Sequence, residues 1–464
     1  MACVIAAPAS GSGKTLLSLC LIAWARQLGH SIQPFKVGPD YLDPQLLSLA
    51  ATLPCRNLDL PLCGDNWVQL SFNGYGGRSD MTLVEGVMGL FDGIGASSEG
   101  STAEVAVNLD IPVVLVVDAG GQARSLGALV RGFRDLDPRL NLAGVVLNRV
   151  SSPRHRELLE EVLTDIGVQC LGCLPKDPSL ELPNRHLGLA PAHELSCLQK
   201  RLGHWASLAK QHLNMDVFRT LLQSPKRGPD PIQSLFSPAP ESSQQHVLPI
   251  AVAQDEAFHF RYPEMQECLE LLGMPVLPWS PLSDAAPPSE ATGLILPGGF
   301  PELHAEQLSE CKTTFSSLHA WLRDKPIYAE CGGMLLLGRG LAGPDGTLHT
   351  MAGLLPFEAR LGRLQVGYRL LEARTDSLLL RKGERLRGHE FHRWQLCSES
   401  DESVGSFGPL WQVEGWKVEC RAEGWNLPNL HASWVHLHWA GSSMIPCRWR
   451  AALGFAAKRN VAAL

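Results

Sequence analysis

A cysteine followed by two glycines interrupts an apolar stretch at residues 327–335, IYAECGGML. The apolar residues predict a strand that ends at Cys331, and the glycines permit the sharp turn that presents a nucleophile before a helix begins. A helix N-terminus favours the reactive thiolate form of such a cysteine. The backbone amides of Gly332, after the cysteine, and of Gly299, in LPGGFPE, are expected to form an oxyanion hole. The pattern predicts a nucleophile for acyl chemistry, with a buried structural thiol as the alternative.

A nucleophilic thiolate needs a general base, and HASWVHLHW near the end of the chain offers three histidines. In a strand, His436 and His438 share one face, and His431 faces the other way. A downstream histidine paired with such a cysteine is typical of cysteine acyl transfer. Core histidines, histidines that support another residue, and a zinc cluster remain alternatives at this point.

The start of the chain carries a second candidate site, in which a short apolar run leads into PASGSGKT and then a helical apolar pattern. Strand, glycine-rich turn and helix is the context of a phosphate-binding loop. The glycines let successive N–H groups face one anion, Lys14 is expected to reach the terminal phosphates, and Thr15 to bind Mg²⁺. Pro8 replaces the first glycine of the common motif, so we expect a loop one residue longer, with Ala7 in that place. The alternative is a glycine- and serine-rich turn with a chance Lys-Thr pair.

The 464 residues carry a formal charge of −7 and are 45% hydrophobic and 19% charged. This is the composition of a globular protein with a large core, and it predicts neither nucleic acid nor a membrane as a partner. The longest apolar run, IPVVLVVDA, is far shorter than the roughly 18 residues of a membrane span. Because the first strand is predicted to begin at once, we expect no signal peptide. Thirteen scattered cysteines fit reduced thiols in the cytoplasm. The lone CxxC at residues 170–173 is expected to be structural.

Apolar runs alternate with helical patterns over residues 1–222 and again over residues 249–464. Such alternation predicts an α/β fold of two domains, each built on a mostly parallel sheet with helices on both faces. Residues 223–248 are rich in Pro, Ser and Gln and predict a linker. Parallel sheets bind ligands at the carboxyl ends of their strands, so KVGPDYLDP and EGVMGLFDG, which follow two of the strands, are candidate site loops.

A series of motifs occurs here in the same order as in the cobyrinate a,c-diamide synthases, and the chain resembles that family from its first strand to its last motif. The motifs are ASGSGKT, PFKVGPDYLDP, LVEGVMGLFDG, LPNRHLGL, DEAFHFRYPE, LPGGFPE, YAECGGMLLLG, GHEFH and HASWVHLHW. The N-terminal half is similar to the P-loop fold of dethiobiotin synthetase, and the C-terminal half to class I glutaminases. The resemblance therefore implies an ATP-binding amidoligase domain followed by a glutamine amidotransferase domain.

This resemblance implies a carbon–nitrogen ligase that uses ATP and glutamine to amidate the a- and c-acetate carboxylates of cobyrinate in cobalamin biosynthesis. Cys331 would attack glutamine, with His436 as general base and acid, and a carboxylate phosphorylated by ATP would receive the ammonia. His438 stands where class I glutaminases often carry an acid, so a Cys–His dyad is expected. Hydrogenobyrinate and nickel-sirohydrochlorin are alternative substrates. A nucleotide-switched binding ATPase with an inert glutaminase-like domain is an alternative of another class.

The resemblance also implies a metal site in the first half. Mg²⁺ would be held by the hard oxygen ligands of Thr15, Asp40 and Glu85, with Asp43 as the alternative to Asp40. Capped turns and a plain loop acid are the alternative interpretations of these carboxylates. The residues expected to bind ATP are Ser10, Gly11, Ser12, Gly13, Lys14, Thr15 and, at the adenine edge, Asn148.

Further residues follow from the same resemblance. Lys36, together with Lys14, would neutralise the transferring phosphoryl group, because phosphoryl transfer depends on positioning and charge stabilisation. Tyr41 and Leu42 are expected to contact the macrocycle. His389 and His392 belong to the motif GHEFH without an assigned role. The protein is expected to bind only small molecules (cobyrinate, glutamine and ATP) and to be a monomer or a homodimer.

Overall fold

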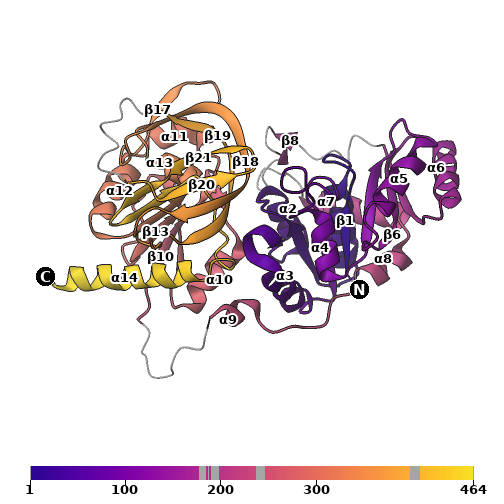
Figure 1. Cartoon of the computed structure of the whole chain (residues 1–464), viewed down its shortest axis with the longest axis horizontal. Helices are drawn as coiled ribbons and strands as arrows, with labels where there is room; N and C mark the ends of the chain where they lie inside the picture. Colours follow the sequence, from indigo (N-terminus) through magenta and orange to yellow (C-terminus); the bar gives the residue numbers. More distant parts are fainter. Residues whose placement is uncertain are drawn as a thin grey trace. The chain divides into compact units, whose positions relative to one another are not determined.

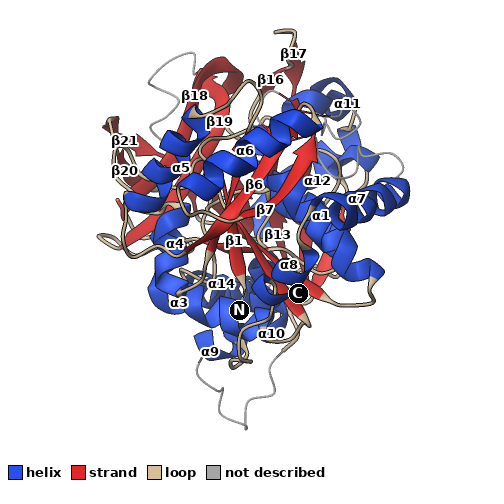
Figure 2. Ribbon diagram, turned by 90° about the vertical axis from the view of Figure 1, so that its right-hand side faces the viewer, coloured by secondary structure: helices blue, strands red, loops and turns tan. Residues whose placement is uncertain are grey.

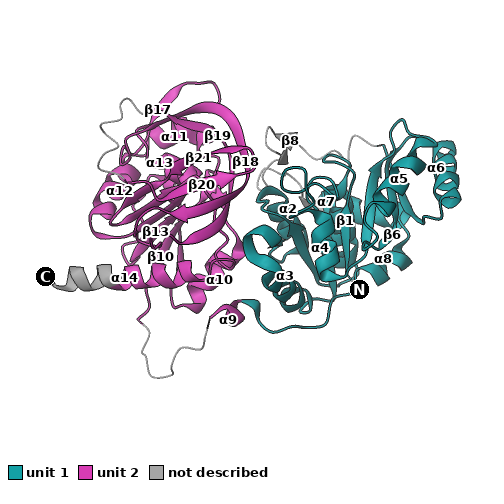
Figure 3. Cartoon of the chain, viewed as in Figure 1, with its two compact units in different colours: residues 1–231 teal, residues 232–464 magenta. Residues whose placement is uncertain are grey.

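The computed structural model describes residues 2–176, 184–185, 188–189, 198–236, 246–397 and 408–462. These form two compact units, Met1–Pro231 and Ile232–Leu464 (Figures 1 and 3). Residues 237–245 of the predicted linker, and half of the motif LPNRHLGL, lie outside the described residues. Within that description, no helix has the length and apolar character needed to cross a membrane.

The first unit is built on a seven-stranded sheet with the order β3-β2-β4-β1-β5-β6-β7, in which all neighbours are parallel (Figure 2). The strands are β1 (Cys3–Ala6), β2 (Ile32–Val37), β3 (Arg56–Leu58), β4 (Met81–Glu85), β5 (Val113–Asp118), β6 (Leu142–Val150) and β7 (Cys170–Pro175). The helices are α1 (Lys14–Gln27), α2 (Leu42–Ala51), α3 (Leu60–Gly76), α4 (Thr102–Leu109), α5 (Ser125–Asp135), α6 (Pro153–Asp165), α7 (Leu198–His212) and α8 (Met215–Leu221). A short antiparallel pair, β8 (Asn184–Arg185) and β9 (Gly188–Leu189), stands apart from the sheet.

Both faces of this sheet are covered, which is why its strands read as nearly continuous apolar runs. On β2, Ile32 packs into the core formed with α1, α2 and α7, whereas Phe35 points to the opposite face, where its ring lies 5.7 Å from that of Phe72 on α3. β1 lies between β4 and β5, so the chain order reverses at the centre of the sheet. The loop after β1 therefore lies beside the loop after β4, at the kind of switch point where α/β sheets bind ligands.

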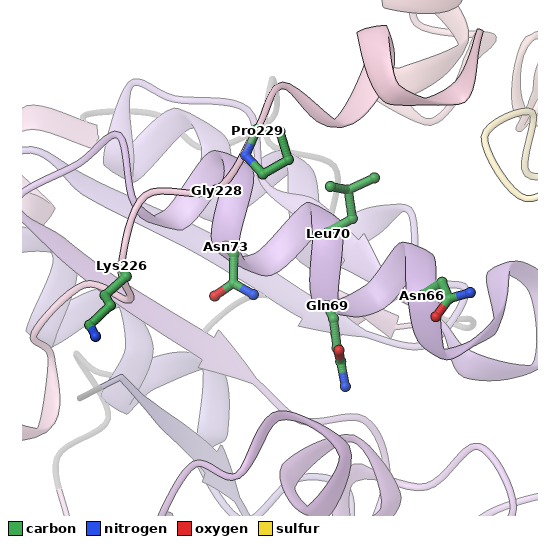
Figure 4. A pocket seen from close by; sticks show the side chains of 7 residues that line it. All are labelled: Asn66, Gln69, Leu70, Asn73, Lys226, Gly228 and Pro229. Atoms are coloured by element: carbon green, nitrogen blue, oxygen red, sulfur yellow. The ribbon is translucent and has the colours of Figure 1, made fainter. Parts of the chain in front are cut away.

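The segment that leaves the first unit packs on α3 instead of running free. A Cβ at Gly77 would lie 2.4 Å from the Arg227 Cα, and the Gly228 amide donates to the Asn73 carbonyl at 3.1 Å. An open pocket of about 450 Å³ lies along this contact (Figure 4). It is lined by Asn66, Gln69, Leu70, Asn73, Lys226, Gly228 and Pro229. The first residues after 222 thus belong to the first unit, and none of the predicted site residues lines this pocket.

The second unit contains a six-stranded sheet with the order β12-β10-β13-β15-β23-β22, parallel except for the last pair. Its strands are β10 (Ile250–Ala253), β12 (Val276–Trp279), β13 (Gly293–Leu296), β15 (Ile327–Glu330), β22 (Trp425–Leu427) and β23 (Leu430–Ser433). The helices are α9 (Pro231–Leu235), α10 (Pro263–Leu271), α11 (Ala305–Ser309), α12 (Lys312–Asp324), α13 (Gly332–Leu336) and α14 (Met444–Ala462), with 3₁₀ turns at Pro281–Ser283 (η3) and Pro301–His304 (η4).

The second unit also contains a largely antiparallel sheet. It contains β16 (Gly340–Ala342), β17 (Leu348–Thr350), β18 (Glu358–Ala373), β19 (Arg385–Cys397), β20 (Trp411–Gly415) and β21 (Val418–Glu423). A two-stranded ribbon pairs β11 (Phe258–Phe260) with β14 (Gly298–Gly299). The antiparallel sheet and the ribbon are additions to the mostly parallel sheet that the sequence predicted.

Candidate active sites

Cys331 lies at a strained turn between β15 and α13. Its backbone has φ 47° and ψ −109°, a conformation that costs a residue with a side chain about 1–3 kcal/mol. The Cys331 amide donates to the Ser433 carbonyl at 2.7 Å, which holds the turn against β23. Only glycine fits at Gly333, because a Cβ there would lie 2.1 Å from the Leu296 carbonyl oxygen. The expected strand, sharp turn and helix are therefore present around this cysteine.

The imidazole of His436 contacts both Cys331 and Glu330. Its Nδ1 lies 3.3 Å from Oε2 of Glu330, and the ring also hydrogen-bonds the Cys331 side chain. Burial lowers the pKa of His436, but the bonds to Cys331 and Glu330 outweigh it and raise this pKa to about 10. His436 is therefore an imidazolium at neutral pH, next to the sulfur atom.

The structure places a carboxylate beside His436 that the sequence did not predict there. The sequence predicted a dyad, because His438 stands where an acid was expected. His438 Nε2 instead lies 3.8 Å from Oε2 of Glu264, whereas the carboxylate beside His436 is Glu330, the residue directly before Cys331. The adjacency of an acid and the cysteine in YAECGG was the available signal. The sequence alone does not predict which histidine Glu330 contacts.

Gly299 and Gly332 come together beside this group. A Cβ on Gly332 would lie 3.0 Å from the Gly299 nitrogen. Gly299 has φ 157°, and a Cβ there would lie 2.1 Å from the Ala257 carbonyl oxygen, so the ribbon of β11 and β14 requires glycine at this position. The two backbone amides that the sequence predicted for an oxyanion hole are thus neighbours.

The motif GHEFH also belongs to this site. His389 pairs with His436 in an isolated antiparallel bridge, with N···O distances of 3.0 Å and 2.8 Å. Burial lowers the pKa of His389 to about 3, so its ring is neutral. The His392 ring stacks on Trp434 with centroids 3.8 Å apart. Strand β19, which carries this motif, therefore fixes the backbone of His436. The sequence did not predict this role.

In the first unit, the loop between β1 and α1 has the backbone of a phosphate-binding turn. Gly11 and Gly13 have φ values of 79° and 112°, which favour glycine. Ser10 and Gly11 are exposed, and the Ser12 hydroxyl donates to the Ala9 carbonyl at 2.9 Å. Glycine is required at position 13 because a Cβ would lie 2.2 Å from Nδ2 of Asn148.

Asn148 supports this loop from β6. Its Nδ2 donates to the Ser12 carbonyl at 2.9 Å, and its Oδ1 accepts from the Arg149 amide at 2.9 Å. Lys14 Nζ donates to the Met88 carbonyl at 2.5 Å, in the loop that follows β4. The expected contact of Asn148 with adenine stays a prediction, and its contact with the loop backbone is an additional role.

A buried lysine gathers the acidic residues at the ends of β2 and β4. Lys36 is 2% exposed, and its Nζ lies 2.5 Å from Asp43, 2.9 Å from Glu85 and 3.9 Å from Asp40. Burial lowers the pKa of Lys36, but the three carboxylates outweigh it and raise this pKa well above its usual value. The pKa of Lys14 falls to about 8, through burial and then through repulsion by Lys36.

The same cluster has the donor atoms that Mg²⁺ prefers. Thr15 Oγ1 donates to Oε1 of Glu85 at 3.0 Å, and Oε2 of Glu85 is buried with no hydrogen-bond partner among the described residues. Burial and the neighbouring Asp43 raise the pKa of Asp40 to about 7. An unsatisfied buried oxygen and crowded carboxylates fit a bound cation with oxygen ligands. The residues present therefore fit the metal that the resemblance implies.

Asn57 is a residue of this site that the sequence did not single out. Its Nδ2 donates to the carbonyls of both Gly38 and Asp40 at 2.8 Å, which fixes the loop between β2 and α2. Asp40 Oδ1 in turn accepts from the Leu42 amide at 2.9 Å, so this carboxylate also caps the start of α2. Tyr41 and Leu42 are buried, at 6% and 7% exposed, and their contact with a macrocycle stays a prediction.

One further group has metal-ligand side chains. Among the described residues, Glu160, Cys170 and Cys173 are the group of three whose ligand atoms lie within 4.8 Å of one another. The two sulfur atoms are 3.8 Å apart, and Glu160 is already paired with Arg156 at 2.8 Å. Because the carboxylate is neutralised by an arginine, we retain the interpretation of these cysteines as structural.

Comparison with known proteins assigns each half of the chain. Residues 3–189 match the model of the CobQ/CobB/MinD/ParA nucleotide binding domain, and residues 249–444 match that of the CobB/CobQ-like glutamine amidotransferase domain. The cobyrinate a,c-diamide synthase of Gloeobacter violaceus is 40% identical over 442 residues, which cover 95% of this chain and 94% of that relative. The chain belongs to the cobyrinate a,c-diamide synthase family.

Other relatives in the family have similar coverage. The cobyrinate a,c-diamide synthase of a Synechococcus species is 39% identical over 95% of this chain and 96% of its own length. The hydrogenobyrinate a,c-diamide synthase of Mycobacterium tuberculosis is 39% identical over 94% of each chain. Family membership confirms the predicted α/β class, the nucleotide-binding domain and the glutamine-dependent ligase class. The two domain matches fall in separate units of the structure.

Proposed function

We propose that this protein amidates the a- and c-acetate carboxylates of cobyrinate, with ammonia from glutamine and with activation by ATP, in cobalamin biosynthesis. The names of the relatives support the substrate. The observation that carries the proposal is the presence in one chain of both half-sites, the Cys331–His436 pair and the phosphate-binding loop beside the Lys36 carboxylate cluster. The Mycobacterium relative supports hydrogenobyrinate as the second candidate substrate.

In the glutaminase half-reaction, the Cys331 thiolate attacks the amide carbonyl of glutamine. The Gly299 and Gly332 amides donate to the oxyanion of the tetrahedral intermediate. The imidazolium of His436 gives its proton to the departing nitrogen, which leaves as ammonia. The acyl group stays on Cys331 as a thioester. His436 then takes a proton from water, which hydrolyses the thioester to glutamate and frees the cysteine.

In the ligase half-reaction, a substrate carboxylate oxygen attacks the γ-phosphate of ATP and ADP leaves. Lys14 would leave the Met88 carbonyl for the phosphate oxygens, and Lys36 would add a second positive charge. Ammonia then attacks the acyl phosphate, and inorganic phosphate leaves. Thr15, Glu85 and Asp40, with Asp43 as the alternative, would hold Mg²⁺, which would neutralise charge on the phosphates. The cytoplasm as location, small molecules as the only partners, and a monomer or homodimer are parts of this proposal.

The test is incubation of the purified protein with ATP, Mg²⁺, glutamine and each macrocycle, followed by mass spectrometry. Two carboxylate-to-amide conversions on cobyrinate are the expected result. Conversion of hydrogenobyrinate alone would favour the second candidate. ATP turnover without glutamate release would contradict the proposal and favour a nucleotide-switched binding protein.

A variant separates the two half-reactions. Cys331→Ala is expected to abolish glutamine-dependent amidation, because the variant lacks the sulfur that forms the thioester in this scheme. It should retain amidation with added ammonium salts, because the phosphate-binding loop lies in the other unit. Loss of both activities in a folded variant would show that the two sites do not act separately.

A further inference from the structure

Glu330 is a buried carboxylate whose two oxygens have separate partners. Oε1 accepts hydrogen bonds from the Tyr328 hydroxyl and from the Leu437 amide, the latter at 3.1 Å. Oε2 faces Nδ1 of His436 at 3.3 Å. Glu330 is 2% exposed, and a carboxylate buried to this degree needs compensating donors to be tolerated. The donors present hold this carboxylate in one orientation.

Neighbouring residues also hold Glu330 and His436 in place. The Tyr328 ring is fully buried, stacks on His431 with centroids 5.0 Å apart and meets Trp439 edge-on at 5.3 Å. The backbone of His436 is pinned by its two hydrogen bonds with His389. A carboxylate and an imidazole that are each held independently keep their mutual distance without help from substrate.

We propose that Glu330 positions His436 and thereby completes a cysteine–histidine–acid triad, with the acid supplied by the residue before the nucleophile. This inference rests on the proposed glutaminase function of Cys331 and His436. The carboxylate accepts a hydrogen bond from the Nδ1–H group, so Nε2 is the nitrogen left to exchange a proton with the sulfur. Glu330 touches neither glutamine nor the reacting atoms in this scheme, so it is a positioning residue.

A purely structural role for Glu330 is the competing explanation, because it also binds Tyr328 and Leu437. The two explanations differ in what an isosteric amide does. In Glu330→Gln the amide oxygen still accepts from Tyr328 and Leu437, but the amide nitrogen now faces Nδ1 and donates to it. His436 must then carry its proton on Nε2, toward the sulfur, and cannot act as a base. The fold survives such a change better than the proton transfer does.

The test compares Glu330→Gln with Glu330→Asp and with Glu423→Gln. Glu423 is the control for a buried carboxylate that does not meet the imidazole: it accepts from Trp411 Nε1 at 2.6 Å, from the Ser433 hydroxyl at 2.7 Å and from the Trp434 amide at 2.9 Å. For each variant, kcat and KM for glutamine, ammonia-dependent amidation, thermal unfolding and the pH profile of glutamine hydrolysis are measured.

Glu330→Gln is expected to lower kcat for glutamine about 10²–10⁴-fold, with a small change in KM and with ammonia-dependent activity retained. Glu330→Asp should recover part of kcat, because it restores a carboxylate. The alkaline limb of the pH profile should move to lower pH in Glu330→Gln, since the imidazolium has lost a negative neighbour. The other titratable groups that face His436 are Cys331 and His389, and His389 is neutral.

Wild-type kcat and an unmoved pH profile in Glu330→Gln would overturn the inference. So would a loss of kcat that Glu423→Gln shows equally, since both would then report general destabilisation. A wild-type protein that hydrolyses no glutamine would instead overturn the proposed function, and is therefore a distinguishable outcome.

Discussion

Lys36→Met tests the charge balance of the first unit. Methionine retains the bulk of the lysine stem but removes the charge that lies within 4 Å of three carboxylates. Removing one partner of a buried ion pair costs about 3–5 kcal/mol, and the three acids left behind place this variant at the upper end. For a unit of this size 1 kcal/mol shifts the unfolding midpoint by about 2–4 °C, so a cost of about 5 kcal/mol predicts a fall of about 10–20 °C.

The assay is calorimetric unfolding of the whole chain with and without Mg²⁺. The uncompensated carboxylates of the variant should bind the cation more strongly than those of the wild type, where Lys36 already neutralises them. A ligand at 100 times its Kd stabilises by about 2.7 kcal/mol, so Mg²⁺ should restore a measurable part of the lost midpoint. Lys210→Met, on an exposed position of α7, is the control and should change stability by no more than about 0.5 kcal/mol.

Two results would refute this reasoning. If Lys36→Met unfolds at the wild-type temperature, the three carboxylates do not depend on the lysine for compensation. If Mg²⁺ raises the midpoints of variant and wild type equally, the cation does not bind among these carboxylates.

Two further substitutions probe the second unit. Gly298→Ala places a Cβ 2.6 Å from Cε1 of His436, so glutamine-dependent activity should fall at least about 10²-fold while ammonia-dependent activity is retained; Gly454→Ala, with open space around it, is the kinetic control. Burial raises the pKa of Glu302 to about 7, so the folded state holds this proton more tightly than the unfolded chain. Stability should therefore rise as the pH falls from about 7 towards 4.5. Glu302→Gln should flatten that dependence and stabilise the protein at pH 8 by up to about 3 kcal/mol. An unchanged slope of unfolding midpoint against pH in the variant would contradict the raised pKa of Glu302.

Much of the fold could be predicted because its signals are local. The run before Gly11 and Gly13 and the run before Cys331 each combine strand, turn and helix within a few residues, and backbone sterics make such turns depend on glycine. The alternation of apolar runs likewise predicted two α/β units. The antiparallel sheet was not predicted, because the pairing of β18 with β19 depends on which strands meet and in which register, and the sequence has no local signal for either.

The partners within each site could not be predicted with the same success. His438 is two residues from His436 in the sequence, yet it faces Glu264, while Glu330 reaches His436 from the end of β15. The role of Asn57 could not be predicted for the same reason, since its two acceptors, the carbonyls of Gly38 and Asp40, lie in the loop after the neighbouring strand β2.

The amino-acid sequence by itself determined the two reactive turns and the order of the domains, because these depend on the conformational limits of consecutive residues. Only the tertiary structure decided which acid supports the histidine, which lysine compensates the carboxylates and which strand holds the catalytic backbone. Those choices depend on which strands become neighbours in a sheet. Strand order is settled by packing of the whole unit, and no short stretch of sequence contains it.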